Sequence, residues 1–187
     1  MAVGALSGLV LTVASGRGDK LVGGADTGDF PAGSVPAPRV TELRAAAKAA
    51  GCTLKSGKSE GQDHVAGGVA YRSNPPHSGN HDQIPVEDGA YPAAQPTERL
   101  VHALEHGRIV VQFSPSAPDE LRGSLKALFD ENPYHVVLGP NSTRTPFAVA
   151  ATAWTKVLGC PRPGPPVFDA VRAFRDRYRD RGPEDVP

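Results

Sequence analysis

The sequence has little of several residue types, and each shortage excludes a class of function. Only two of the 187 residues are cysteines, Cys52 and Cys160, and they form no CxxC pair. A dithiol redox motif and a zinc site built from cysteines are therefore both excluded. Met1 is the single methionine, which argues against a copper(I) carrier with thioether ligands. Lysine plus arginine and aspartate plus glutamate both number 20, so no excess of positive charge attracts nucleic acid.

The chain is long enough for one globular domain with extended ends, because single domains usually contain about 100 to 200 residues. Glycine (21 residues) and proline (19) are abundant, while aromatic residues make up only 6%. This composition indicates a modest core that carries long irregular segments. We therefore predict a single domain over residues 40–187. Residues 17–39, rich in glycine, aspartate and proline, have too little apolar surface to fold and are interpreted as a flexible linker.

The N-terminal residues bear on the compartment. Met1–Gly16 is an apolar run of small residues without a charged side chain, and it is similar to a secretion signal that lacks its basic start. A disordered alanine- and glycine-rich terminus is the alternative. A truncated signal or membrane anchor predicts an extracytoplasmic protein, in which Cys52 and Cys160 can form a disulfide. Such a bridge closes a loop of about 100 residues and would stabilise the fold by about 4 to 5 kcal/mol.

Hydrophobic patterns predict an α+β fold. After a short helix over residues 40–50, seven elements follow in the order βαβαββα. This order occurs in thioredoxin-like α/β sandwiches, and a generic α+β sandwich is the alternative. The predicted strands are 65–71, 108–113, 134–138 and 147–154, and the predicted helices are 97–106, 118–131 and 168–181. Residues 72–96 contain five prolines and no periodicity, which predicts a long, stiff loop of the kind that is usually functional or disordered.

The segment Thr97–Gly107, TERLVHALEHG, is the most informative part of the sequence. Thr97 can cap the start of a helix, and Gly107 fits its end. His102, Glu105 and His106 share one face of this helix, while apolar residues take the other. His102 and His106 lie one turn apart, the spacing at which two imidazoles can bind one metal ion. A solvated polar face would give the same pattern, but histidine is a poor default residue for such a face.

Further histidines precede this helix, because the proline-rich loop contains His77 and His81. A stiff loop can deliver a third ligand to the two histidines of the helix, so we predict a mononuclear metal site. Its ligands are His81, His102 and His106; His64 or His77 is the candidate for a fourth, and Glu105 or Glu98 would orient a ligand or accept a proton. Nitrogen ligation suits one copper or zinc ion per chain, and an exported location favours copper slightly.

The letters HALEH also match the HxxEH pattern, in which two histidines hold zinc and the glutamate is the general base for peptide hydrolysis. In this interpretation Glu105 is catalytic. The chemistry needs a third protein ligand and an open coordination position, and Glu184 lies at a suitable separation in the sequence.

The segments discussed above resemble a bacterial family known as domain of unknown function 3105. The likeness covers residues 52–184 and rests on Cys52, His64, Tyr71, Pro75, Pro76, Ser78, Gly79, His81, the helix from Glu98 to Gly107, Trp154, Cys160, Phe168 and Asp169. The resemblance implies an exported or membrane-tethered location and implies no activity. It suggests His81, His102 and His106 as shared positions, with His64 as a further candidate. The chain departs from the family pattern at His77, where threonine is usual, and at Asp82 and Gln83.

Two classes of function follow from these observations. The first is an extracytoplasmic metal-binding protein with histidine ligands, of which a metal-dependent oxidoreductase is one form. The second is a metal-free binding or structural module of the cell envelope, in which residues 72–96 form a recognition surface and the histidines only donate and accept hydrogen bonds. The zinc hydrolase is a further alternative. The expected partner is a small molecule or an envelope protein, without nucleic acid, and the N-terminal segment is a candidate membrane tether.

Overall fold

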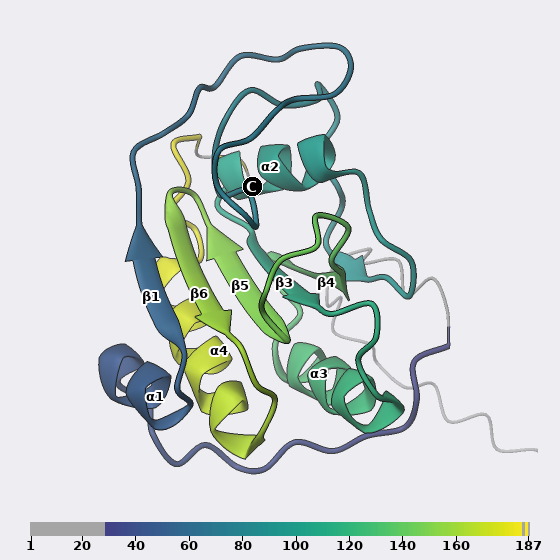
Figure 1. Ribbon diagram of the computed structural model, residues 1–187, viewed down its shortest axis with the longest axis vertical. Helices are drawn as coiled ribbons and strands as arrows, with labels where there is room; N and C mark the ends of the chain where they lie inside the picture. The colour runs from purple at the N-terminus through teal and green to yellow at the C-terminus, as the bar shows by residue number, and fades with distance from the viewer. Residues whose placement is uncertain (1–28, 185, 187) are drawn as a thin grey trace, which may run out of the picture.

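A mixed sheet of six strands lies at the centre of the fold, in the order β1-β6-β5-β3-β4-β2 (Figure 1). The computed structural model describes residues 29–184 and 186, so the apolar run Met1–Gly16 and most of the predicted linker lie outside the described residues. The helices are α1 (Leu43–Ala49), α2 (Thr97–Glu105), α3 (Asp119–Glu131) and α4 (Pro165–Tyr178). The strands are β1 (Thr53–Ser56), β2 (Gly89–Ala90), β3 (Ile109–Phe113), β4 (Val136–Pro140), β5 (Val149–Ala153) and β6 (Lys156–Cys160).

The direction of the strands changes across the sheet. β4 runs parallel to both β2 and β3, whereas β5 is antiparallel to β3 and to β6, and β1 is antiparallel to β6. α3 connects the parallel strands β3 and β4, and such a connection needs a crossover helix because a tight turn cannot join parallel strands. The described residues therefore form a single α+β domain, as the sequence predicted.

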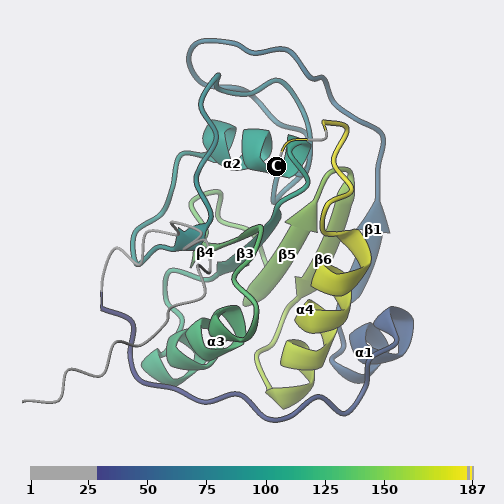
Figure 2. The same ribbon diagram turned by 180° about the vertical axis from the view of Figure 1, so that it is seen from behind.

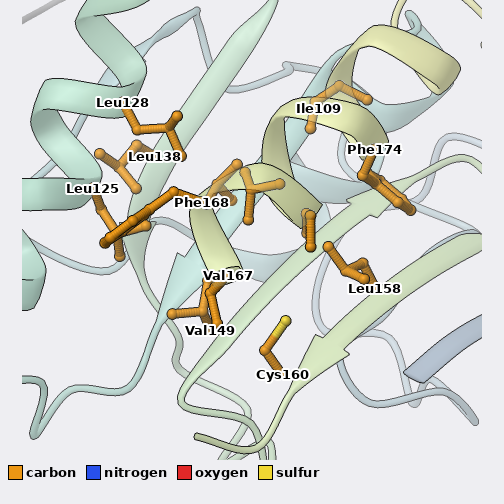
Figure 3. Close-up of a cluster of buried hydrophobic side chains, with 14 of the residues drawn as sticks. Ile109, Leu125, Leu128, Leu138, Val149, Leu158, Cys160, Val167, Phe168 and Phe174 are labelled. Carbon is orange, nitrogen blue, oxygen red and sulfur yellow. The ribbon is translucent and has the colours of Figure 1, made fainter. Parts of the chain in front are cut away.

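One face of the sheet carries the main hydrophobic core. α3 and α4 lie on this face, with α1 beside α4 (Figure 2). Ile109 and Val111 of β3 point into this core while Val110 points to the other face, because successive side chains of a strand alternate. Phe168 and Phe174 of α4 pack among these side chains (Figure 3).

The opposite face of the sheet positions α2. Leu100 and Leu104 of this helix pack against Val110 of β3 and Val137 of β4, and Trp154 lies partly buried beside them. The long connection between β1 and β2 runs over α2 at one end of the sheet (Figure 1). α2 is therefore held between the sheet and this loop.

The order of elements differs from the predicted βαβαββα. The strand predicted at residues 65–71 is not formed; a single bridge joins His64 to His81 instead. Gly67 and Gly68 interrupt this apolar run and most of it is exposed, so it lacks the side-chain packing that stabilises a strand. The predicted strand 147–154 is the first half of a hairpin, since the chain turns at Thr155 (φ 60°) and returns as β6. β1 and β2 were not predicted because they are short and have no alternating pattern.

The segment predicted as a linker is packed in its described part. Phe30 lies edge-on to Phe113, with ring centroids 6.3 Å apart. The backbone amides of Arg39 and Val40 donate to Oδ2 of Asp169, at 3.1 Å each. The packed part of the chain therefore extends to residues before position 40, along α3 and α4.

Cys52 and Cys160 form a disulfide that ties the start of β1 to the end of β6 across 108 positions of sequence. This pairing confirms the expected bridge, and structural disulfides are typical of oxidising compartments. Among the described residues, no helix is both long enough and apolar enough to cross a lipid bilayer.

Candidate metal centre

Two parts of the chain build the site, the C-terminal half of α2 and the loop that covers it. The loop folds back on itself, because the amide of Val65 donates to the carbonyl of His81 (2.8 Å) and the amide of His81 donates to the carbonyl of Asp63 (3.0 Å). This pair of hydrogen bonds holds His64 beside His81. The amide of Val69 donates to Oε1 of Glu98 at 3.1 Å, which fastens the loop to the start of α2.

The loop buries the polar face of α2. His102 and Glu105 are only 3% and 1% exposed, and His81 is fully buried against them. A solvated helix face, the alternative weighed from the sequence, is therefore excluded for these positions. Burial of this kind is costly unless each polar group finds a partner.

Four side chains offer ligand atoms that lie within 4.8 Å of one another: His64, His81, His102 and Glu105, here called the inner group. Its three ring-to-ring separations are similar, with the centroids of His81 and His102 4.7 Å apart. Three members are buried and His64 is exposed. The group thus reaches solvent on the side of His64.

Hydrogen bonds to backbone carbonyls orient two imidazoles and place a proton on Nδ1 of each. Nδ1 of His81 donates to the carbonyl of Gly79 at 2.8 Å, and Nδ1 of His102 donates to the carbonyl of Asp82 at 2.7 Å. A carbonyl only accepts, so Nδ1 carries a proton in both rings, and in a neutral ring Nε2 then keeps its lone pair. Burial, followed by the neighbouring histidines, lowers the pKa of His102 to about 4. His102 is therefore neutral at neutral pH, as a metal ligand must be.

Two buried atoms of the inner group have no hydrogen-bond partner among the described residues: Nε2 of His81 and Oε2 of Glu105. They lie 2.9 Å apart, but outside hydrogen-bond geometry. The other oxygen of Glu105 accepts from Nε2 of Gln62 at 3.2 Å, which orients the carboxylate. Tetrahedral ligands at about 2.0 to 2.1 Å from a zinc ion lie roughly 3.3 Å from one another, so the spacing of these two atoms fits ligation of one ion. Three imidazoles and one carboxylate suit zinc or copper.

His106 lies one step outside the inner group, in contact with it through His102. The two Nε2 atoms are 2.9 Å apart, and because Nε2 of His102 carries no proton, His106 donates. Nε2 of His106 also lies 3.3 Å from Oε2 of Glu184. Burial and then Arg108 lower the pKa of His106. His102, His106 and Glu184 form a second set of potential ligands, here called the outer group.

Two residues considered as ligands or helpers lie elsewhere. His77 is buried against Gly57, with its Nδ1 3.2 Å from Oγ of Ser78, and it belongs to neither group of potential ligands found within the described residues. Glu98 holds the loop through Val69, as described above. Trp154 stands edge-on to His81 at 6.3 Å and forms part of the wall.

From the sequence, Glu105 was predicted to accept a proton or orient a ligand. In the structure its carboxylate lies with the potential metal ligands His64, His81 and His102. Its spacing of three residues from His102 is the signal that puts both side chains on one helix face. Gln62 was missed altogether, because its segment is polar and has no periodicity. His64 was considered only as a possible fourth ligand, and the bridge to His81 brings it to the inner group.

The fold and these side chains define an α+β domain with a buried cluster of histidine and carboxylate. A model of the family described as Protein of unknown function (DUF3105) matches residues 64–186, more than half of the chain. The chain belongs to this family, which confirms the resemblance found in the sequence. No curated protein and no solved structure matches the chain.

Proposed function

We propose that this protein binds one copper or zinc ion in the inner group, and that it does so outside the cytoplasm. The observation that carries the proposal is that Nε2 of His81 and Oε2 of Glu105 are buried 2.9 Å apart, and neither atom has a hydrogen bond within the described residues. Buried polar atoms are nearly always paired, so two that face each other need an explanation. A shared cation supplies one, because it would accept a lone pair from each.

The surroundings of the inner group support ligation. Backbone carbonyls orient the rings of His81 and His102, which is the usual arrangement around metal-binding histidines. The carboxylate of Glu105 supplies one negative charge among imidazoles, and it lies in the last turn of α2, where the helix dipole favours a cation. The disulfide between Cys52 and Cys160 supports an oxidising, extracytoplasmic location.

The exposure of His64 bears on what the ion can do. A ligand that faces solvent can be replaced by water or by a small molecule, and exchange of that kind gives catalytic metal sites their open position. The buried ligands His81, His102 and Glu105 would remain. We therefore propose an ion with one exchangeable position, which suits a small-molecule partner and includes a metal-dependent oxidoreductase.

The test is the metal content of the purified full-length protein after expression with added copper and with added zinc. We expect about one equivalent in the wild type, and its loss in His81→Ala and in His102→Ala. His77→Ala is the matched control, since His77 is a buried histidine outside both groups. Circular dichroism spectra and thermal melts verify that each variant folds. No metal in any sample would support the metal-free envelope module instead.

A zinc hydrolase of the HxxEH type is less well supported. His102, His106 and Glu184 gather as that interpretation requires, but the general base would have to face a water on the outer group. One oxygen of Glu105 faces His81 and the other accepts from Gln62. Both are thus engaged on the side of the inner group, and we do not propose hydrolysis.

A thioredoxin-like topology is our further interpretation of the fold. The strand neighbours β6-β5-β3-β4 support this interpretation, while no helix lies in the described chain between β4 and β5, where the order βαβαββα has one. The chain carries no dithiol motif, and the two cysteines are bridged. A thiol redox activity would require this bridge to open in mild reductant, and alkylation of released thiols measures whether it does.

A further inference from the structure

The C-terminal segment after α4 folds back onto the end of α2 (Figures 1 and 2). The amide of Asp180 donates to the carbonyl of Gly107 at 2.9 Å, and the amide of Glu184 donates to the carbonyl of Glu105 at 3.2 Å. Between them, Gly182 lies so close that a Cβ at this position would collide with the carbonyl oxygen of Glu105. Only glycine allows the backbone at position 182 to come this close to α2. This contact fixes the position of the backbone of Glu184 relative to the helix.

This docking brings Glu184 to His106 and completes the outer group. The exposed fraction of the side chains falls from 46% for Glu184 to 13% for His106, and His102 is buried. Neighbouring side chains in this series are close together. Oε2 of Glu184 lies 3.3 Å from Nε2 of His106, and Nε2 of His106 lies 2.9 Å from Nε2 of His102. Potential ligands therefore extend from solvent to the inner group.

We propose that His102, His106 and Glu184 form an outer position for the metal ion, through which the ion passes between solvent and the inner group. This inference rests on the proposed function, because it assumes that the inner group binds an ion. The class of ligand is a divalent copper or zinc ion, held by two imidazoles and one carboxylate.

His102 makes the two positions mutually exclusive. Its Nδ1–H is committed to the carbonyl of Asp82, so only the lone pair on Nε2 can bind an ion. In the metal-free protein, His106 donates its Nε2 proton to that lone pair. For an ion to bind at the outer position, His106 changes tautomer: Nε2 gives its proton to solvent and Nδ1 takes one up, so that the ring stays neutral and the Nε2 atoms of both rings bind the ion. It then exchanges His106 and Glu184 for His81 and Glu105 while it keeps His102, with no change in its oxidation state.

A position on the path changes rates and leaves the final equilibrium unchanged. The first test is stopped-flow binding of Cu²⁺ alone to the full-length protein, with release measured against a chelator. For Glu184→Gln we expect both the association and the dissociation rate to fall about fivefold or more, with Kd kept within about twofold. His106→Ala should slow both rates as well, with an equal or lower Kd, because His106 no longer donates to the lone pair of His102 in the metal-free protein. Glu120→Gln is the matched control, since Glu120 is exposed on α3, and it should bind as the wild type does.

The inference is wrong if both rates are unchanged in Glu184→Gln and His106→Ala. It is also wrong if Kd rises about tenfold with an unchanged association rate, because the two residues would then be ligands in the loaded protein. A wild type that binds no Cu²⁺ would overturn the proposed function as well. A wild type that binds Cu²⁺ with rates insensitive to both substitutions would overturn only this inference.

A second test isolates the outer position. His81→Asn removes a ligand of the inner group and leaves His102, His106 and Glu184 in place. We expect this variant, like His81→Ala, to be purified without metal but to take up one equivalent of added Cu²⁺ more weakly than the wild type does, and the double variant with His106→Ala to take up none. Equal residual binding in the single and double variants would contradict the proposal. Circular dichroism verifies that both are folded.

Discussion

Replacement of Glu105 by glutamine is the sharpest test of the inner group. The metal-site and metal-free interpretations predict opposite changes in the stability of the protein measured without metal. In the metal-free protein, glutamine keeps the shape of the side chain and its oxygen can still accept from Gln62. Its amide nitrogen takes the place of Oε2, 2.9 Å from Nε2 of His81, and a small rotation lets it donate to that lone pair. Two unpartnered buried atoms become one hydrogen-bonded pair.

The expected gain for Glu105→Gln is about 1 kcal/mol, the net value of a typical buried hydrogen bond. In a domain of this size that gain raises Tm by about 2 to 4 °C. The metal-bound protein should respond in the opposite direction, because the variant lacks the only charged ligand of the inner group. Disturbing the residues around a metal ligand costs about 10- to 100-fold in affinity, so the loss of a ligand itself should cost about 100-fold or more.

The alternative function, a module that never binds metal, predicts that Glu105→Gln lowers the stability of the protein. If His81 were charged and paired with Glu105, the substitution would break a buried ion pair and cost about 3 to 5 kcal/mol. Thermal melts with a chelator and with Cu²⁺, together with calorimetric titration, separate the two cases. A lower Tm without metal and an unchanged copper affinity would refute the metal-site reasoning. Glu120→Gln again controls for removal of an exposed carboxylate.

Three further predictions concern the surroundings of the site. Gly79 has φ 128° and a Cβ there would lie 2.9 Å from the ring of Tyr71, so Gly79→Ala should cost about 1 to 3 kcal/mol in urea unfolding, and copper affinity measured by titration should fall about 10- to 100-fold. The pKa of His102 is lowered from 6.5 to about 4, so the unfolded chain binds more protons between these values; the free energy of unfolding of the metal-free protein should therefore decrease as pH falls through this window. Removal of the disulfide by paired Cys52→Ala and Cys160→Ala substitutions should cost about 2 to 5 kcal/mol in the same assay, while the copper stoichiometry stays at the wild-type value because Cys160 lies in the main core (Figure 3).

The sequence predicted the bounds of α2 to within one residue, Thr97–His106 against the observed Thr97–Glu105. It did so because Gly107 ends the helix with a positive φ of 79°, a conformation that favours glycine. Strands were harder to predict. β1 has four exposed residues and β2 only two residues, so neither has the periodic pattern by which strands are recognised. Their pairing depends on neighbours that are distant in the sequence.

The residues of the candidate site could be predicted only in part, because some of them are brought together by contacts between distant parts of the sequence. Helical periodicity groups His102 with Glu105 and His106, since these contacts are local. No local pattern shows that the chain between β1 and β2 doubles back to pair His64 with His81, or that Glu184 returns to α2 from the end of the chain. Both contacts are made through backbone hydrogen bonds, which any residue type can form.

The energetics of the loop link these features. α2 already packs Leu100 and Leu104 on the sheet. The loop that covers its other face removes His102 and Glu105 from water and is a long irregular segment, which is ordered at an entropic cost. Fixing imidazole tautomers through the carbonyls of Gly79 and Asp82 recovers only part of that cost, since Nε2 of His81 stays unpartnered. A bound cation would recover the rest by mass action. It follows that copper or zinc should protect the backbone amides of Val65 and His81 from hydrogen exchange more than those of β3, and equal protection throughout would show that the loop is ordered without the ion.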